Sequence, residues 1–236
     1  MPAPVNGALS AGPAVALAAE WRLAGGTRVA CTGWSQGDMA GTGAASERRR
    51  KAVVDLPWTL LQQVHGARVV TVDHPGGGFG EPADAAVSAV AGAALAVLTA
   101  DCAPVALASP EGLFGVAHAG WKGLRAGVIE ATVQSLRRLG ATRVEAVLGP
   151  CIHPCCYAFG DEELMEIEAR LGRHLRAADR DGRPALDLPA GVRAALHAAG
   201  ASLVGEATDC TGCAGGLWSW RTGRTERRQA TVVWRP

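Results

Sequence analysis

The sequence lacks three patterns that would narrow its function at once: an imbalance of charge, a long apolar run and the residue pattern of a leader peptide. Its 236 residues carry a formal net charge of +1, so the overall charge attracts neither nucleic acid nor an acidic membrane. No stretch has the ~20 consecutive apolar residues that a membrane-spanning helix needs. The Ala-rich residues 1–26 have no basic start, and Glu20 and Arg22 interrupt them, which indicates a mature N-terminus. We therefore expect a cytoplasmic protein that binds neither nucleic acid nor membranes.

The chain also lacks an internal repeat and a linker that would divide it. Its hydrophobic content of 48% is ordinary for a globular protein, so we expect one domain over residues 1–236, as a monomer or a weak homodimer. The seven cysteines are an odd number in a chain without an export signal. Disulfides are then unexpected, and thiols that bind a metal or take part in catalysis become the better hypothesis.

Hydrophobic patterning predicts alternating strands and helices from about residue 60 onward. Strands are expected at 67–73, 93–100, 104–109, 112–118, 143–149 and 229–235, and helices at 124–140, 161–176 and 189–200. Segment 112–149 is then a βαβ unit, which predicts an α/β fold with a partly parallel sheet and a right-handed crossover. Residues 33–47, rich in Gly, Ala and Ser, are expected to form a loop.

Two histidines and one cysteine stand at the ends of predicted strands, where α/β proteins build their sites: His65, Cys102 and His118. Two imidazoles and a thiolate are a typical set of zinc ligands, and three ligands leave the fourth position open for water. Zinc would lower the pKa of that water toward ~7. Asp101, next to Cys102, could orient a ligand or transfer a proton. In the simpler interpretation Cys102 is a small buried residue and His65 a loop residue.

Two further patterns allow functional and structural interpretations. Cys151, His153, Cys155 and Cys156, together with Cys210 and Cys213, offer CxxxC and CxxC spacings that could close a structural zinc site. Reduced thiols in a turn are the simpler interpretation, because the first spacing is loose. In residues 118–125 a helix is expected to start near Gly123, where free N–H groups, Lys122 and Arg125 could bind phosphate or a carboxylate. Those two charges could equally be helix surface, and Trp121 could stack on a planar base or lie in the core.

Several stretches together resemble one known family. They are QQVHGARVV (62–70), TADCAPVAL (99–107), GVAHAGWKGL (115–124), LGPCIHPCCYAFG (148–160) and, more weakly, residues 217–234. In this order they resemble the YfiH or laccase-domain family, also called polyphenol oxidases and described as purine nucleoside phosphorylases. The combination of QVHG, ADC and HAGW carries the resemblance.

The resemblance implies a single compact domain in which helices flank two packed mixed β-sheets. It implies zinc bound by His65, Cys102 and His118, with phosphorolysis of adenosine, inosine and methylthioadenosine and a related deamination of adenosine. We expect substrate contacts from Gln63, Trp121, Lys122 and Arg125. It also assigns Cys155 and Cys156 to a motif unconnected with that metal, which weakens the structural-zinc interpretation.

The sequence departs from the family in residues 28–50, which places substrate specificity in question. Lys122 stands where relatives often carry Arg, so a bidentate anion contact would be lost there. Arg221 and Arg228 are further candidates for anion contacts.

Three competing hypotheses remain. The first is a cysteine hydrolase with Cys102 as nucleophile and His118 as base. The family resemblance would make it an amide hydrolase that edits peptidoglycan precursors. The second is a copper-dependent polyphenol oxidase, although copper usually takes more imidazole or a Cys–His–His–Met set, and the six histidines here are scattered. The third is a binding module without catalysis, in which all these residues are structural.

Overall fold

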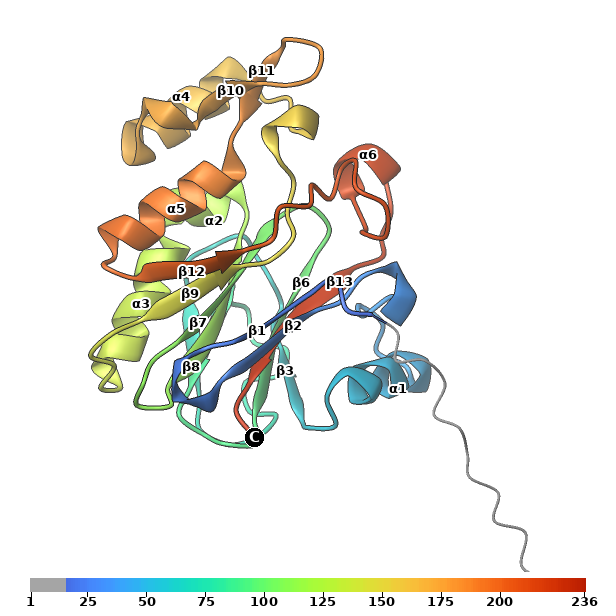
Figure 1. Ribbon diagram of the computed structural model, residues 1–236, viewed down its shortest axis with the longest axis vertical. Helices are drawn as coiled ribbons and strands as arrows, with labels where there is room; N and C mark the ends of the chain where they lie inside the picture. The colour runs from blue at the N-terminus through green and yellow to red at the C-terminus, as the bar shows by residue number, and fades with distance from the viewer. Residues whose placement is uncertain (1–15) are drawn as a thin grey trace, which may run out of the picture.

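The strands of the chain form two mixed sheets that pack face to face, as the computed structural model shows for residues 16–236 (Figure 1). The five-stranded sheet has the order β1 (Ala19–Arg22), β2 (Arg28–Cys31), β13 (Gln229–Trp234), β6 (Ala94–Thr99) and β3 (Trp58–Leu60). The six-stranded sheet has the order β12 (Ser202–Glu206), β9 (Glu145–Leu148), β7 (Ala103–Ala108), β8 (Phe114–Ala119), β5 (Ala85–Ser88) and β4 (Val69–Val72). Strands β3–β6, β4–β5 and β9–β12 pair in parallel, and the other neighbours pair antiparallel.

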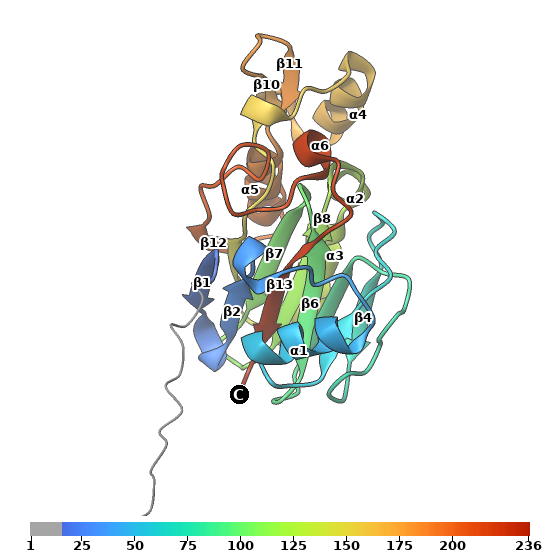
Figure 2. The ribbon, with the colours of Figure 1, turned by 90° about the vertical axis from the view of Figure 1, so that its right-hand side faces the viewer.

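Helices cover the outer faces of both sheets (Figures 1 and 2). Helices α2 (Trp121–Ala126), α3 (Val128–Arg138) and α5 (Leu188–Ala198) lie on the six-stranded sheet, and α4 (Asp161–Leu171) lies beyond them next to the hairpin β10 (Arg176–Ala178) and β11 (Pro184–Leu186). Helix α1 (Ala44–Val53) lies on the side of the five-stranded sheet, and α6 (Trp220–Gly223) precedes β13. Short 3-10 turns are η1 (Ala24–Gly26), η2 (Trp34–Gln36), η3 (Pro154–Cys156) and η4 (Arg173–Leu175).

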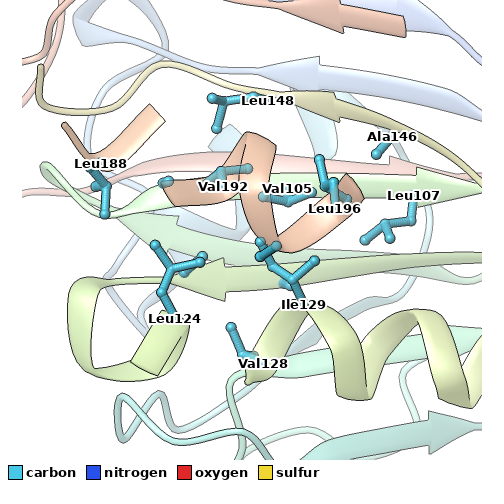
Figure 3. Packing of buried hydrophobic residues seen from close by; sticks show 14 of the residues in the cluster. Val105, Leu107, Leu124, Val128, Ile129, Ala146, Leu148, Leu188, Val192 and Leu196 are labelled. Carbon is cyan, nitrogen blue, oxygen red and sulfur yellow. The ribbon is translucent and has the colours of Figure 1, made fainter. Parts of the chain in front are cut away.

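Strand β7 shows how the layers are held together. Its Val105 and Leu107 pack under Ile129 of α3 and Val192 of α5 (Figure 3). The alternate residues of β7 point to the opposite face and join Leu95 and Val97 of β6 in the layer between the sheets. Because both faces of β7 are buried, the strand is continuously apolar, as expected for a central strand covered on both sides.

The expected class of fold, two packed mixed sheets flanked by helices in a single domain, is confirmed. Predicted strands 67–73, 93–100, 104–109, 112–118, 143–149 and 229–235 correspond to β4, β6, β7, β8, β9 and β13, and predicted helix 189–200 corresponds to α5. The strands β8 and β9 of the predicted βαβ unit run parallel but are not paired, because β7 lies between them and is antiparallel to both.

Three predicted boundaries were wrong. The helix expected at 124–140 begins at Trp121 and breaks at Gly127, whose φ of 89° is left-handed. The helix expected at 161–176 ends at Leu171, because Gly172 has a φ of 102°. The loop expected at 33–47 gives way to α1 at Ala44, with Glu47 in the first turn of the helix.

Within residues 16–236, every helix is too short or too polar to cross a membrane. The first part of the stretch interpreted as a mature N-terminus, residues 1–15, lies outside the residues that the structure describes.

The chain changes from one sheet to the other at residues 100–102. Strand β6 belongs to the five-stranded sheet and β7 to the six-stranded sheet, and only three residues separate them. Asp101 has a φ of 110°, in the left-handed half of backbone space that L residues rarely adopt. The acid and the thiol that interrupt the apolar run of 97–108 therefore mark a sharp crossing between sheets.

Candidate metal centre and pocket

His65, Cys102 and His118 converge in space. One nitrogen of each imidazole and the Cys102 sulfur lie within 4.8 Å of one another. The Cys102 Sγ is 3.8 Å from His65 Nε2, and the two imidazole centroids are 4.9 Å apart. The three residues come from the β3–β4 loop, the crossing between the sheets and strand β8, so the fold unites positions that are far apart in the sequence.

A buried carboxylate, Asp84, holds two of the three residues in place. Its Oδ1 lies 2.8 Å from His118 Nδ1, which leaves Nε2 of that ring as the free nitrogen. The same carboxylate accepts the backbone N–H groups of Val64, His65 and Gly66 at 3.1, 2.9 and 2.7 Å. These bonds fix the loop at His65, whose φ is 59°. Asp84 was not predicted as a site residue, although an acid directly before the apolar run 85–87 was a possible signal.

Asp101 points to a different partner from the one expected. Its carboxylate accepts hydrogen bonds from Thr211 Oγ1 at 2.7 Å and from the backbone N–H of Arg221 at 2.6 Å. It therefore fastens the C-terminal segment to the crossing between the sheets. The carboxylate that orients an imidazole, the role considered for Asp101, is Asp84.

Gly120 leaves the room that the cluster needs. A Cβ at this position would lie 2.9 Å from Cys102 Sγ and 3.0 Å from His65 Cδ2. Any larger residue would push the thiol or the imidazole away. The glycine of the HAGW stretch is therefore required because the Cys102 and His65 side chains come close to its Cα. Its backbone angles are ordinary and would not require glycine.

The electrostatics of the cluster favour a thiolate. Burial alone would raise the pKa of Cys102, but the charges and hydrogen bonds of His118 and His65 outweigh it and lower this pKa to about 6. Burial would lower the pKa of His118, and the Cys102 and Asp84 charges reverse this and raise it to about 9. Metals bind the thiolate and the neutral imidazole, so Cys102 would bind as the thiolate already present at neutral pH, and His118 would lose a proton when the metal binds.

The donor set fits zinc better than copper. Two imidazoles and a thiolate, one imidazole backed by a carboxylate, match a zinc site with an open position. A Cys–His–His–Met copper site needs an axial methionine. Of the residues that the structure describes, no methionine lines the pocket beside this cluster.

The cluster opens into a cavity of about 750 Å³, within the range usual for small-molecule sites. Gln63, Trp121 and Lys122, three of the expected substrate contacts, line it, and so do Arg221 and Arg228. Arg125 does not line it: its guanidinium pairs with Glu166 and lies against the Trp121 ring.

The polar atoms of the lining divide into engaged and free groups. The Gln63 amide is hydrogen-bonded twice to the Leu98 backbone, both at 2.8 Å, so this side chain locks the loop to β6. Buried Thr99 Oγ1 has no hydrogen-bond partner among residues 16–236. Lys122 forms no ion pair within residues 16–236, and its Nζ lies 5.6 Å from the centre of the Trp121 ring.

Two aromatic residues of the lining were not predicted. Tyr157 and Trp220 line the cavity, and Arg221 lies over the Tyr157 ring at 4.9 Å. Their motifs, residues 148–160 and 217–234, were recognised, but the pattern did not indicate which side chains face inward.

The fold and the site together define a two-sheet α/β protein with a His–Cys–His centre at the crossing between its sheets. The sequence profile of the family described as multi-copper polyphenol oxidoreductase laccase matches residues 29–236. The chain belongs to this family of enzymes.

Relatives and solved structures agree with this assignment. The chain is 43% identical over 178 residues to a purine nucleoside phosphorylase of Streptomyces coelicolor, covering 74% of this chain and 73% of that protein. It is 40% identical over 206 residues to one of Streptomyces griseus, covering 84% and 82%. The fold is similar to Neisseria meningitidis protein NMB0706, with a TM-score of 0.76 and 25% identity over 88% of this chain and 93% of that one. Bacillus licheniformis hypothetical protein YfiH matches with a TM-score of 0.76 and 24% identity over 89% and 93%.

Proposed function

We propose that this protein is a zinc-dependent purine nucleoside phosphorylase that acts on adenosine, inosine and methylthioadenosine, and that it also deaminates adenosine. The observation that carries the proposal is the convergence of His65, Cys102 and His118 beside a cavity lined by both indoles and cations. The relatives at 40–43% identity are named purine nucleoside phosphorylases, which supports the same class of reaction.

His65 Nε2, Cys102 Sγ and His118 Nε2 would hold the metal. When bound, zinc supplies a Lewis acid at the edge of the cavity. Asp84 keeps the His118 ring in one orientation and, when the ring is neutral, in one tautomer, because its carboxylate accepts a hydrogen bond from Nδ1–H. It also fixes the loop that carries His65. The chain's contribution is therefore a set of donors arranged in advance of binding.

The cavity lining can bind the two substrates separately. Lys122, Arg221 and Arg228 provide positive charge for phosphate, while the Trp121 and Trp220 indoles provide flat surfaces for a purine. In phosphorolysis a phosphate oxygen forms the bond to the ribose anomeric carbon as the bond from that carbon to the purine nitrogen breaks. The electron pair of the broken bond passes to the base, which takes up a proton. The products are the free base and a pentose 1-phosphate.

Deamination needs water in place of phosphate and a different carbon of the substrate. Water adds to the ring carbon that bears the amino group, ammonia leaves, and adenosine becomes inosine. The two reactions are distinguished by their products and by their dependence on phosphate.

The test is a screen of zinc-loaded protein with adenosine, inosine and methylthioadenosine, with and without phosphate. We expect free base and pentose 1-phosphate only with phosphate, and inosine from adenosine without it. Cys102→Ala should abolish both, whereas Cys31→Ala, a buried thiol that is not one of the three donors and does not line the cavity, should retain them. If the zinc-loaded protein forms neither free base nor inosine, the proposal is contradicted.

A second candidate function is a cysteine hydrolase that cleaves an amide. The order Cys102, His118 and Asp84 is that of a nucleophile, its base and the acid that orients the base, and the lowered pKa of Cys102 favours it. A thiol hydrolase would keep its activity after removal of metal by a chelator and lose it on alkylation. The zinc enzyme would lose activity on chelation and regain it with zinc.

We also keep as proposals a location in the cytoplasm, one domain over residues 1–236 and a monomer or weak homodimer. Light scattering during size exclusion at several concentrations measures the assembly state. A stable higher oligomer would contradict that part.

A further inference from the structure

Four cysteines outside the pocket form a second cluster. The sulfurs of Cys155, Cys156, Cys210 and Cys213 lie within 4.8 Å of one another. The Cys155 sulfur is 3.8 Å from those of both Cys156 and Cys213. A tetrahedron of sulfurs around zinc, with Zn–S bonds of about 2.3 Å, has edges of about 3.8 Å. We propose that these four thiolates form a closed structural zinc site.

Backbone contacts bring the two cysteine pairs together. Cys151 and Cys210 form a parallel bridge, and the Thr211 N–H donates to the Cys151 carbonyl at 3.0 Å. Beyond the bridge, the 3-10 turn η3 presents Cys155 and Cys156 from one side. The N–H of Cys213 donates to the Cys210 carbonyl at 3.2 Å, which forms the tight turn typical of a CxxC ligand pair. Backbone hydrogen bonds therefore hold the four cysteines near one another.

The surroundings of the sulfurs leave little room, and one backbone contact favours a thiolate. Burial raises the pKa of Cys210 to about 11, so zinc would displace the thiol proton when it binds. The His153 N–H donates to the Cys210 sulfur at 3.3 Å, a contact that stabilises a negatively charged sulfur. A Cβ on Gly212 would lie 2.6 Å from the Cys156 Cβ, so the turn between Cys210 and Cys213 has room only for glycine there. Four thiolates and one divalent ion would leave a charge of −2. Arg180 of the β10–β11 hairpin is the cation nearby, and the charges of Cys213, Cys156 and Cys155 raise its pKa.

The arrangement corrects the pairing considered from the sequence. Cys151, the first cysteine of the CxxxC spacing, is buried in the core under the helices and is not in the cluster. Cys156, the neighbour of Cys155, takes its place. His153 contributes its backbone N–H.

A zinc ion here would hold a segment that the pocket depends on. Residues 207–219 connect β12, at the edge of one sheet, with α6 and β13 in the other. Thr211, between two of the four cysteines, donates to Asp101, which precedes Cys102. A closed site with four protein ligands has no position for substrate, so its role would be to fasten this connection. The inference stands apart from the proposed function, because it involves none of the pocket's donors.

The test uses the full chain with the pocket centre disabled by His65→Ala and Cys102→Ala. This variant, prepared with zinc and a reductant, should contain one zinc per chain by elemental analysis. Adding Cys213→Ala should remove it, and adding Cys151→Ala, the matched buried thiol beside the cluster, should leave it. Cobalt in place of zinc should give strong thiolate-to-cobalt absorption in the near ultraviolet and tetrahedral bands in the visible, both lost with Cys213→Ala.

Three results would overturn the proposal. The disabled variant could contain no zinc, or zinc could remain after Cys213→Ala. A disulfide could also be present among the four cysteines of protein prepared with zinc and a reductant. If Cys213→Ala does not fold, native mass spectrometry of the disabled variant decides, because bound zinc adds its mass less that of the displaced protons. An inactive wild-type protein with this zinc would contradict only the proposed function. An active protein without it would contradict only this inference.

Discussion

Asp84 Oδ1 lies 2.8 Å from His118 Nδ1, and both side chains are buried. The same carboxylate binds the backbone N–H of His65, so one acid sets the geometry of two of the three donors in the pocket. Burial would raise the pKa of Asp84, but its hydrogen bonds from His118 and the loop outweigh burial and lower it. The carboxylate is therefore ionised at neutral pH and supports the imidazole as a metal ligand.

Asp84→Asn should weaken zinc binding at the pocket centre by ~10- to 100-fold, the usual effect of removing a carboxylate behind a ligand histidine. The amide keeps the shape but loses the charge that holds the Nδ1 proton. Competition with a chromophoric chelator measures the affinity. Asp73→Asn, an exposed acid that also pairs with a histidine, is the matched control and should leave the affinity unchanged. Equal affinities for Asp84→Asn and wild type would show that this carboxylate does not support the metal.

Metal removal should expose a reactive thiolate at Cys102. Its pKa in the metal-free protein is lowered to about 6, so the thiolate forms as pH rises through 6. The rate of alkylation by iodoacetamide should reach its plateau by about pH 7, where an ordinary thiol of pKa about 8.5 is still mostly protonated. Cys31, whose pKa burial raises to about 12, should remain unmodified.

Zinc should protect Cys102 in the same assay, because the metal occupies its sulfur. Peptide mass spectrometry after alkylation with and without zinc measures the protection residue by residue. An alkylation rate at Cys102 that zinc does not change would argue against this thiol as a ligand.

Much of the fold could be predicted from the sequence because its central strands are long and apolar. The runs that became β6, β7 and β8 are continuous, and a continuous run predicts a strand buried on both faces. Which sheet each strand joins could not be predicted. The change of sheet depends on the backbone of Asp101, whose φ of 110° no propensity indicates. Strand β5, an Ala-rich stretch of four residues, carried too weak a pattern to be recognised.

The candidate donors of the site could be predicted, but their partners could not. Strand ends and the family resemblance indicated His65, Cys102 and His118, whereas the type of a polar residue does not show which residue it contacts across the fold. Asp84 and Asp101 are both single acids beside apolar runs, and the hydrogen bonds that separate their roles are long-range contacts. Arg125 seemed suited to the pocket by its position in the sequence, yet its partner Glu166 on another helix turns it away.

Gly120→Ala should damage the pocket centre without unfolding the protein. The added Cβ would meet Cys102 Sγ at 2.9 Å and His65 Cδ2 at 3.0 Å, so one donor must move. Zinc affinity should fall, and a misplacement of about 1 Å at a reacting centre can reduce turnover by about 100-fold. Gly43→Ala is the control, because its Cβ would meet no atom within 4 Å. Unchanged zinc affinity in Gly120→Ala would mean that the donors do not meet beside this glycine.

Asp101→Asn separates a positioning role from a proton-transfer role. Asparagine tolerates a positive φ, and its oxygen can accept from the Arg221 N–H while its Nδ2 donates to the Thr211 hydroxyl, so both contacts lose the charged acceptor. Loss of this charge should reduce the free energy of unfolding by about 1–2 kcal/mol, measured by urea denaturation. Thr211→Val should also destabilise the protein, and the double variant should cost less than the sum, because both changes act on the same bond. If Asp101 only positions the crossing, the pH profile of turnover keeps its shape and zinc content is unchanged. Loss of a limb of that profile at full zinc content would instead assign Asp101 to proton transfer.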